Sequence, residues 1–377
     1  PSVTLFAGHM VDAAGRAAPR FPVENEARIR EEIRQYLRSV KAGFGYSSAA
    51  CGGDLIFCEC LLEMDAKVNL VLPMPVDAFK RQSVSFAGPE WERRFHNVLG
   101  QATTMLIANP AEYSTVGFDP ALKMGFVYAN RIVMGLAVLQ AEALDLELHA
   151  LALWDGRPGD GAGGTGSVVA EWSDRQITAH VIAPGATPAK AAGPAPTAPA
   201  AAPMATGTPP PPSDMAQEIK AVLLAEVINY KKIAERQMPA FVREFKGAVA
   251  QLLAGLSRPP AVSESWGKSF SFVFDDLQAA ALFALDLRDL VTHASWEERG
   301  LPKDLGIRIV LHAGPVFAFT DPMLQRTSCV GTHITRGARI EPVTPPGQVY
   351  VSQEFAALCG GRRQFGVRHA PKYFPQL

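Results

Sequence analysis

Short apolar runs alternate with segments of helical spacing in the first half of the chain. Residues 3–7, 68–72 and 149–154 are apolar runs of strand length, whereas residues 25–40 and 55–64 have the spacing of helices. Strands and helices in alternation predict an α/β domain with a parallel, Rossmann-like sheet that helices cover on both faces. Ligands bind such sheets beyond the carboxyl ends of the strands.

The second half of the chain mixes the two patterns without strict alternation. The expected elements are strands at 219–228, 270–274 and 348–352, helices at 239–256 and 277–291, and a hairpin of residues 307–312 and 316–319 around Gly314 and Pro315. This order predicts an α+β domain, with a ferredoxin-like sheet and helices on one face.

A segment rich in Ala, Pro, Gly and Thr separates the two halves at residues 184–215. Such a composition cannot bury enough side chain to fold, so we predict a flexible linker that lets the flanking domains move relative to each other. The domains are therefore expected at 1–183 and 216–361. Residues 362–377 form a short basic and aromatic tail.

Charge and cysteine content narrow the classes of partner. The net charge is −1, from 36 basic and 37 acidic residues, which speaks against nucleic acid and anionic membranes and favours small molecules or proteins. The apolar segment 122–153 carries several charged residues and is interpreted as a buried helix and strand rather than a membrane span. Five cysteines without a disulfide spacing and no secretory signal at the start predict a cytoplasmic protein.

Glycines follow the predicted strands of the first domain at three places. Gly8 and His9 follow residues 3–7, the sequence Gly52-Gly53-Asp54 precedes a helix, and a glycine-rich loop with Gly164 and Thr165 precedes another. Glycines let a ligand approach the backbone, and a helix start presents free N–H groups to an anion. A plain tight turn explains a Gly-Gly pair about as well. We predict these seven residues, Gly8, His9, Gly52, Gly53, Asp54, Gly164 and Thr165, at a nucleotide pocket.

The motifs LFAGHM, SAACGGDLIFCE and GAGGTGSVVAEW make the first domain resemble the SLOG superfamily, Rossmann-like domains related to the LOG and DprA proteins. The resemblance implies binding of nucleotides or nucleotide-derived ligands. Some members cleave N-glycosidic bonds with a carboxylate, for which Asp54, Glu59 and Glu171 are the nearest candidates, although a solvated or capping role is favoured for each. We expect ligand sensing, with N-glycosidase activity as an alternative.

Three ordered motifs of the second domain, LGIRIVLHAGPV at 305–316, GTHITRGARIE at 331–341 and PPGQVYVS at 345–352, resemble class III adenylate and guanylate cyclases. The resemblance implies a dimer with a shared site, in which two aspartates hold two magnesium ions on the triphosphate. An asparagine and an arginine four positions later contact ribose and phosphate. It also implies Glu264 and Ser328 at the positions that read the purine, with a carboxylate favouring guanine.

The sequence departs from this cyclase pattern at the metal site. Glu226 stands for the first aspartate, Lys268 replaces the second, and Thr335 replaces the asparagine, while Arg339 is kept. We therefore expect Mg²⁺ or Mn²⁺ at one site at most, on Glu226. Lys268 has a second interpretation, because an ammonium can take the place of a cation beside phosphate.

The preferred hypothesis is a bacterial-type nucleotide-signalling protein in which a SLOG-like sensor and a catalytically degenerate cyclase-like domain both bind nucleotides. An active purine nucleotide cyclase that forms cyclic nucleotide and diphosphate, alone or with an intact partner subunit, is the alternative. His312 in the second domain is interpreted as a core histidine with satisfied hydrogen bonds rather than a general base.

Overall fold

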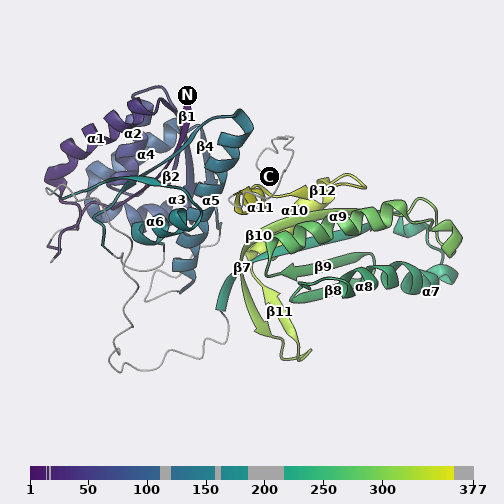
Figure 1. The fold of residues 1–377 in the computed structure, drawn as a ribbon. Helices are drawn as coiled ribbons and strands as arrows, with labels where there is room; N and C mark the ends of the chain where they lie inside the picture. The colour runs from purple at the N-terminus through teal and green to yellow at the C-terminus, as the bar shows by residue number, and fades with distance from the viewer. Residues whose placement is uncertain (14, 17, 111–119, 158–162, 186–215, 361–377) are drawn as a thin grey trace.

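The computed structural model describes the chain except for residues 14, 17, 111–119, 158–162, 186–215 and 361–377, and it contains two sheets (Figure 1). Most of the predicted linker and the predicted tail lie outside the described residues. On either side of the linker, the last strand of the first sheet ends at Ile182 and the first strand of the second begins at Ala216.

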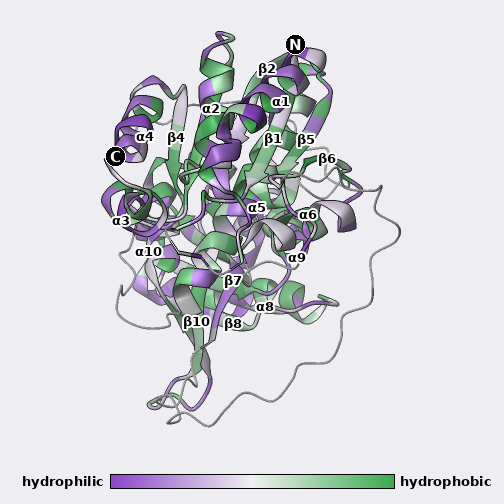
Figure 2. Ribbon diagram, turned by 90° about the vertical axis from the view of Figure 1, so that its left-hand side faces the viewer, coloured by the Kyte–Doolittle hydropathy of each residue, from purple (hydrophilic) through white to green (hydrophobic). Residues whose placement is uncertain are grey.

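The first sheet has six parallel strands in the order β4-β3-β2-β1-β5-β6. Apolar side chains dominate its central strands β1 and β5 (Figure 2), as expected for strands that are buried on both faces. The strands are β1 (Ser2–Gly8), β2 (Ala42–Ser47), β3 (Lys67–Leu72), β4 (Thr104–Ile107), β5 (Leu148–Leu153) and β6 (Ala179–Ile182).

Helices cover both faces of this sheet. They are α1 (Glu26–Ser39), α2 (Gly53–Leu62), α3 (Val76–Ser83) and α4 (Pro89–Gln101), and α5 (Pro120–Leu144) and α6 (Thr165–Asp174). The buried side chains of α1, α2 and α4 form one apolar cluster, and those of α5 and α6 belong to another. The prediction of a parallel sheet between helices is confirmed, and the Rossmann-like assignment stays a prediction.

The second sheet is built on two long antiparallel strands. Its order is β11-β10-β7-β9-β8, and β12 pairs parallel with β10 beyond this path. The strands are β7 (Ala216–Ile228), β8 (Val262–Trp266), β9 (Ser269–Phe274), β10 (Gly306–Thr320), β11 (Thr327–Val330) and β12 (Val349–Val351).

The helices of the second domain lie on both faces of its sheet. They are α7 (Met238–Ala240) and α8 (Gly247–Ala254), which a π-helical segment (Phe241–Lys246) joins, and α9 (Leu277–His293), α10 (Thr332–Ile340) and α11 (Gln353–Gly360). The helices α8 and α9 share a core with Leu223 and Ala225, whereas α10 packs its Gly337 on Leu224 and His312 of the other face. The predicted α+β class is confirmed, but the prediction that helices cover only one face of this sheet is wrong.

The predicted hairpin around Gly314 and Pro315 is wrong, because β10 runs straight through both residues. Gly314 serves close packing: a Cβ there would lie 2.2 Å from the His333 ring. On the side of β10 away from β7, residues 312–316 pair with none of the described strands, because β12 pairs with β10 only up to Leu311 and β11 only from Phe317. A proline is tolerated at such an edge.

Helix α5 joins the two domains. Among the described residues, its segment Leu122–Leu144 is the one helix long and apolar enough to cross a membrane, by length and composition only. Its buried side chains, including Tyr128 and Ile132, belong to one apolar cluster with Leu223 and Phe355 of the second domain. The linker predicts domains that move relative to each other, whereas in this structure α5 packs against the second domain.

Candidate functional site

Strand register places two of the predicted cyclase-like residues, Glu226 and Glu264, on the face of the second sheet that carries α10. Glu226 of β7 lies opposite Ser269 of β9 and Arg308 of β10, and Glu264 of β8 lies opposite Ser271. Because side chains alternate between faces along a strand, Glu226 and Glu264 share the face of Leu224, on which α10 packs.

Glu226 is a buried carboxylate between two cations. Its two oxygens form ion pairs with Lys268, which follows the tight turn after β8, and with Arg308 of the neighbouring strand. Lys268 is half exposed, whereas only 7% of the Glu226 side chain is exposed. Side chains of this protein thus occupy both oxygens that a divalent ion would need.

Glu341 completes this cluster beyond Arg308. Its Oε1 lies 2.7 Å from Arg308 Nε. Burial opposes ionisation of Glu226, but hydrogen bonds with Glu341, Lys268 and Arg308 outweigh it and lower the pKa of Glu226 to about 2. Burial, together with the neighbouring Glu226, raises the pKa of Glu341 to about 7. Near neutral pH Glu226 is therefore ionised and Glu341 only partly ionised, so the two cations face less than two full negative charges.

The donor set of this cluster does not fit the predicted Mg²⁺ or Mn²⁺ ion. Such ions prefer several oxygen ligands, and here two cationic side chains hold the one predicted ligand, Glu226. Within the described part of the chain, no group of three or more His, Cys, Asp or Glu side chains is arranged to hold a metal.

Thr335 and Arg339 lie on the exposed side of α10, one helical turn apart. Thr335 donates its hydroxyl hydrogen bond to the carbonyl of Thr332, within its own helix. In the described residues, no hydrogen bond or ion pair connects Thr335 or Arg339 with Glu226 or Lys268. The structure leaves both side chains facing outward, accessible to a ligand or a partner.

The predicted purine-reading residues lie on the two opposite edge strands of the same sheet, β8 and β11. Glu264 is exposed on β8 and approaches Arg326 at 3.5 Å, and Ser328 is half buried on β11. Trp266, between Glu264 and Lys268 in the chain, is 89% exposed at the end of β8. Neither Arg308 nor Trp266 nor Arg326 was predicted, although Arg308 is the fourth residue of a recognised motif.

At the carboxyl edge of the first sheet, His9 pairs with a residue far away in sequence. His9 Nε2 lies 3.1 Å from Asp155 Oδ1, and Arg20 Nε lies 3.7 Å from Asp155 Oδ2. Burial lowers the pKa of His9, which Asp155 partly opposes. Burial opposes ionisation of Asp155, but the Arg157 N–H and His9 lower its pKa. Asp155 was not predicted, although it follows a predicted strand just as His9 does.

The glycines before α2 allow the loop after β1 to pack closely against them. A Cβ on Gly52, which has a φ of +104°, would lie 2.5 Å from the backbone nitrogen of Val11. The N–H of Gly53 donates to the carbonyl of His9 at 3.0 Å, and the Cα of Gly53 lies against Gly8. The loop after β1 therefore covers the start of α2, and a nucleotide role for Gly8, Gly52 and Gly53 stays a prediction.

The three candidate carboxylates of the first domain all have protein partners. Asp54 is buried, accepts a hydrogen bond from Ser48, and has its pKa raised to about 6 by burial. Glu59 pairs with Arg94 at 2.7 Å and also with Arg30. Asp54 and Glu59 are therefore held by partners within the chain rather than by solvent, and a catalytic role for either stays a prediction.

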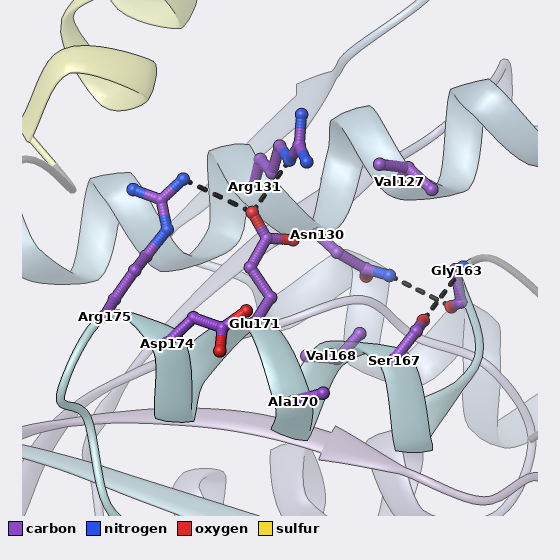
Figure 3. Close-up of a pocket in the computed structure, with 10 residues that line it drawn as sticks. All are labelled: Val127, Asn130, Arg131, Gly163, Ser167, Val168, Ala170, Glu171, Asp174 and Arg175. Carbon is purple, nitrogen blue, oxygen red and sulfur yellow. Dashed lines mark hydrogen bonds and ion pairs between the residues drawn. The ribbon is translucent and has the colours of Figure 1, made fainter. Parts of the chain in front are cut away.

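A pocket of about 530 Å³ lies between α5 and α6 (Figure 3). Glu171 sits at its centre, 2.8 Å from Arg131 and 3.3 Å from Arg175. Asn130 donates to the Gly163 carbonyl at 3.0 Å. Gly164 precedes α6 and Thr165 begins it, so both neighbour this pocket rather than the His9 pair at the strand ends.

Solved structures that are similar to part of this chain include nucleotide cyclases. The guanylyl cyclase domain of the RhoGC fusion protein from the aquatic fungus Blastocladiella emersonii matches 38% of this chain and 87% of its own, at 18% identity and a TM-score of 0.34. The guanylyl cyclase Cya2 matches 43% and 87%, at 15% identity and a TM-score of 0.37. The adenylyl cyclase CyaB from P. aeruginosa matches 38% and 82%, at 15% identity and a TM-score of 0.34. No family model and no curated protein sequence matches this chain.

Proposed function

We propose that this chain is a nucleotide-binding signalling protein whose C-terminal domain has the scaffold of a class III nucleotide cyclase without its metal site. The pairing of Glu226 with both Lys268 and Arg308 carries this proposal. A catalytic cyclase site needs free carboxylates for two metal ions, whereas Glu226, the one carboxylate at the expected metal positions, is already neutralised by two cations.

The electrostatic cost of loading a divalent ion beside Lys268 supports the same conclusion. Two unit charges about 4 Å apart interact by about 4 kcal/mol at an effective dielectric constant near 20, and a divalent ion doubles this value. Exposure of Lys268 weakens the repulsion but does not change its sign. The ammonium instead favours an anion, and a nucleotide phosphate is the ligand that the sequence motifs suggest.

The nucleotide is proposed to lie against the face that carries Lys268, with Arg339 of α10 on its phosphates. Glu264 would accept hydrogen bonds from a guanine, in competition with its ion pair to Arg326. Because Arg339 and Thr335 point outward, a second copy of the domain or a related partner subunit is proposed to complete the site. The dimer is therefore part of the proposal.

Binding and turnover test this function separately. We expect GTP or ATP to bind the purified protein equally well with EDTA and with Mg²⁺ or Mn²⁺, and cyclic nucleotide to stay near background. Lys268→Ala should weaken binding about tenfold, and Lys268→Asp should make binding depend on Mn²⁺. Robust cyclic nucleotide production by the protein alone, or binding that requires a metal in the unaltered chain, contradicts the proposal.

A second candidate function is a cyclase that becomes active with an intact partner subunit. Arg339 favours it, because this side chain is exposed on α10 and free to reach across an interface. Co-expression with such a subunit should yield product only for the pair, and Arg339→Ala should abolish it. Product that survives Arg339→Ala would exclude this candidate.

We further propose that the N-terminal domain senses a small ligand inside a reducing cell compartment. The pocket between α5 and α6 and the His9 pair at the strand ends are two places where polar groups of this domain converge. All five cysteines are free thiols, in keeping with a reducing environment.

A further inference from the structure

Helix α5 packs so closely against the C-terminal domain that Gly135 has no space for a side chain. A Cβ on Gly135 of α5 would lie 1.8 Å from the carbonyl oxygen of Ala357 in α11. One turn away, Leu139 packs on Gly360 at the end of α11. Figure 1 shows α5 and α11 side by side at the junction of the two domains.

Tyr128 of the same helix reaches into the second domain. It is fully buried, and its hydroxyl donates a hydrogen bond of 2.7 Å to the carbonyl oxygen of Ala313 in β10. Its ring meets the His333 ring edge to face, with centroids 5.2 Å apart and an interplanar angle of 82°. A side chain of the N-terminal domain thus contacts both β10 and the first turn of α10.

His333 is locked on the buried face of α10. Only 1% of it is exposed, its Nδ1 lies 2.9 Å from Nε2 of His312, and its ring fills the space that Gly314 leaves open. Thr335 and Arg339 lie on the opposite, exposed face of this nine-residue helix. A shift of the His333 ring would therefore displace the side chains that face the proposed nucleotide.

Helix α11 forms a second link between α5 and α10. Arg336 of α10 forms an ion pair of 2.7 Å with the buried Glu354 of α11. Ser352, just before α11, accepts the Phe355 N–H and lies 2.8 Å from His312 Nδ1. The helix that Gly135 contacts therefore also holds the buried side of α10.

We propose that α5 of the N-terminal domain positions α10 of the C-terminal domain, with Tyr128 and His333 as positioning residues for the nucleotide contacts of Arg339. The inference rests on the proposed nucleotide binding for its functional part. Its structural part, that order in α10 depends on docking of α5, holds or fails independently of any ligand.

The decisive variant is Gly135→Ala in the full chain, with Gly100→Ala as its matched control. Both glycines lie in helices, where alanine is intrinsically favoured, but a Cβ on Gly100 meets nothing within 4 Å. We expect Gly135→Ala to raise amide hydrogen exchange in residues 332–340 at least tenfold, with exchange in β7 and β9 unchanged. The affinity for GTP and ATP should fall about tenfold, to the level of Arg339→Ala, while Gly100→Ala changes neither.

Tyr128→Phe provides a milder test that keeps the ring on His333. Loss of one buried hydrogen bond should raise exchange in residues 332–340 about fivefold and weaken nucleotide binding less than Gly135→Ala does. Exchange that rises in α5 and α11 but not in α10, or uniformly across the second domain, overturns the inference. Absence of nucleotide binding in the unaltered protein overturns the proposed function alone, because the exchange data still report on α10.

Discussion

Each of the two sheets carries an acid of low exposure near a strand end, Glu226 in one and Asp155 in the other, and the surroundings of the two acids differ. In the C-terminal domain, Glu226 has a cation on each oxygen, from Lys268 and Arg308. In the N-terminal domain, Asp155 has His9 on one oxygen, and its Oδ2 lies 3.7 Å from Arg20 with no hydrogen-bond partner among the described residues. The first acid is satisfied by its own chain, whereas the second keeps capacity to accept a hydrogen bond.

The two sites therefore differ in their electrostatic character. A saturated acid beside a half-exposed ammonium attracts anions such as phosphate, and it has little affinity for a metal ion. Asp155, in contrast, has Arg20 at 3.7 Å from Oδ2 but no hydrogen bond from the described residues on that oxygen, so its negative charge is less fully compensated. The comparison predicts that the two edges respond differently to loss of charge.

The largest expected effect comes from acidification and concerns the histidines that lack an acidic hydrogen-bond partner. Burial lowers the pKa of His312 and of His333 to about 3, against 6.5 for an exposed histidine. The unfolded chain therefore takes up protons first as the pH falls below 6.5, and stability is lost toward pH 3. Between pH 7 and 5 the two histidines together should cost on the order of 4 kcal/mol.

The measurement must be a difference, because Glu341 and Asp54 have raised pKa values and gain stability over the same range. Urea unfolding from pH 7 to 5 should show a steeper loss in the unaltered protein than in a His312→Asn, His333→Asn double variant. The exposed His293 is the control, since His293→Asn should keep the steep loss. Equal slopes for the parent and the double variant would refute the assignment of these histidines as neutral core groups.

The second effect tests the saturated acid directly. Glu226→Ala leaves Arg308 and Lys268 without their shared partner and should cost about 2–3 kcal/mol of unfolding free energy, less than a fully buried pair because Lys268 is half exposed. Chemical denaturation at pH 7 measures this loss. Glu264→Ala on the same face removes only an exposed acid 3.5 Å from Arg326 and should cost less than about 0.5 kcal/mol. Similar losses in the two variants would show that Glu226 is not held as described.

The strands β1, β3 and β5 of the first sheet follow from the sequence, because their apolar runs are buried within the domain. The other three strands of this sheet were not predicted: β2 contains two glycines, and β4 and β6 have four residues each, too few for a periodic pattern to identify. The unbroken strand β10 could not be predicted, since a glycine and a proline in succession are typical of a turn. Gly314 is needed there for a ring that lies 19 residues further along the chain.

Some of the candidate site residues could likewise be predicted from the sequence, and others could not. Glu226 and Lys268 were predicted from family motifs, and the structure brings them into contact. Their third partner, Arg308, depends on the register between β7 and β10, which no local pattern encodes. Asp155 lies 146 residues from His9, and only the adjacency of β1 and β5 in the sheet brings them together. Local sequence thus identifies strand ends, but the order of strands decides which of them meet.

The smallest expected effect concerns Asp155 and His9 of the first sheet. Asp155→Asn removes the negative charge beside His9 and leaves only a neutral amide acceptor, so the pKa of His9 should fall further below its ordinary value. The unfolding free energy should drop by only about 1 kcal/mol, because His9 keeps its burial and Arg20 is close to the surface. An NMR titration of the His9 ring and chemical denaturation measure the two quantities, with the exposed Asp174→Asn as a control that changes neither. If the pKa of His9 rose instead, Asp155 would not be the group that holds the histidine proton, and the contrast with Glu226 would lose its basis.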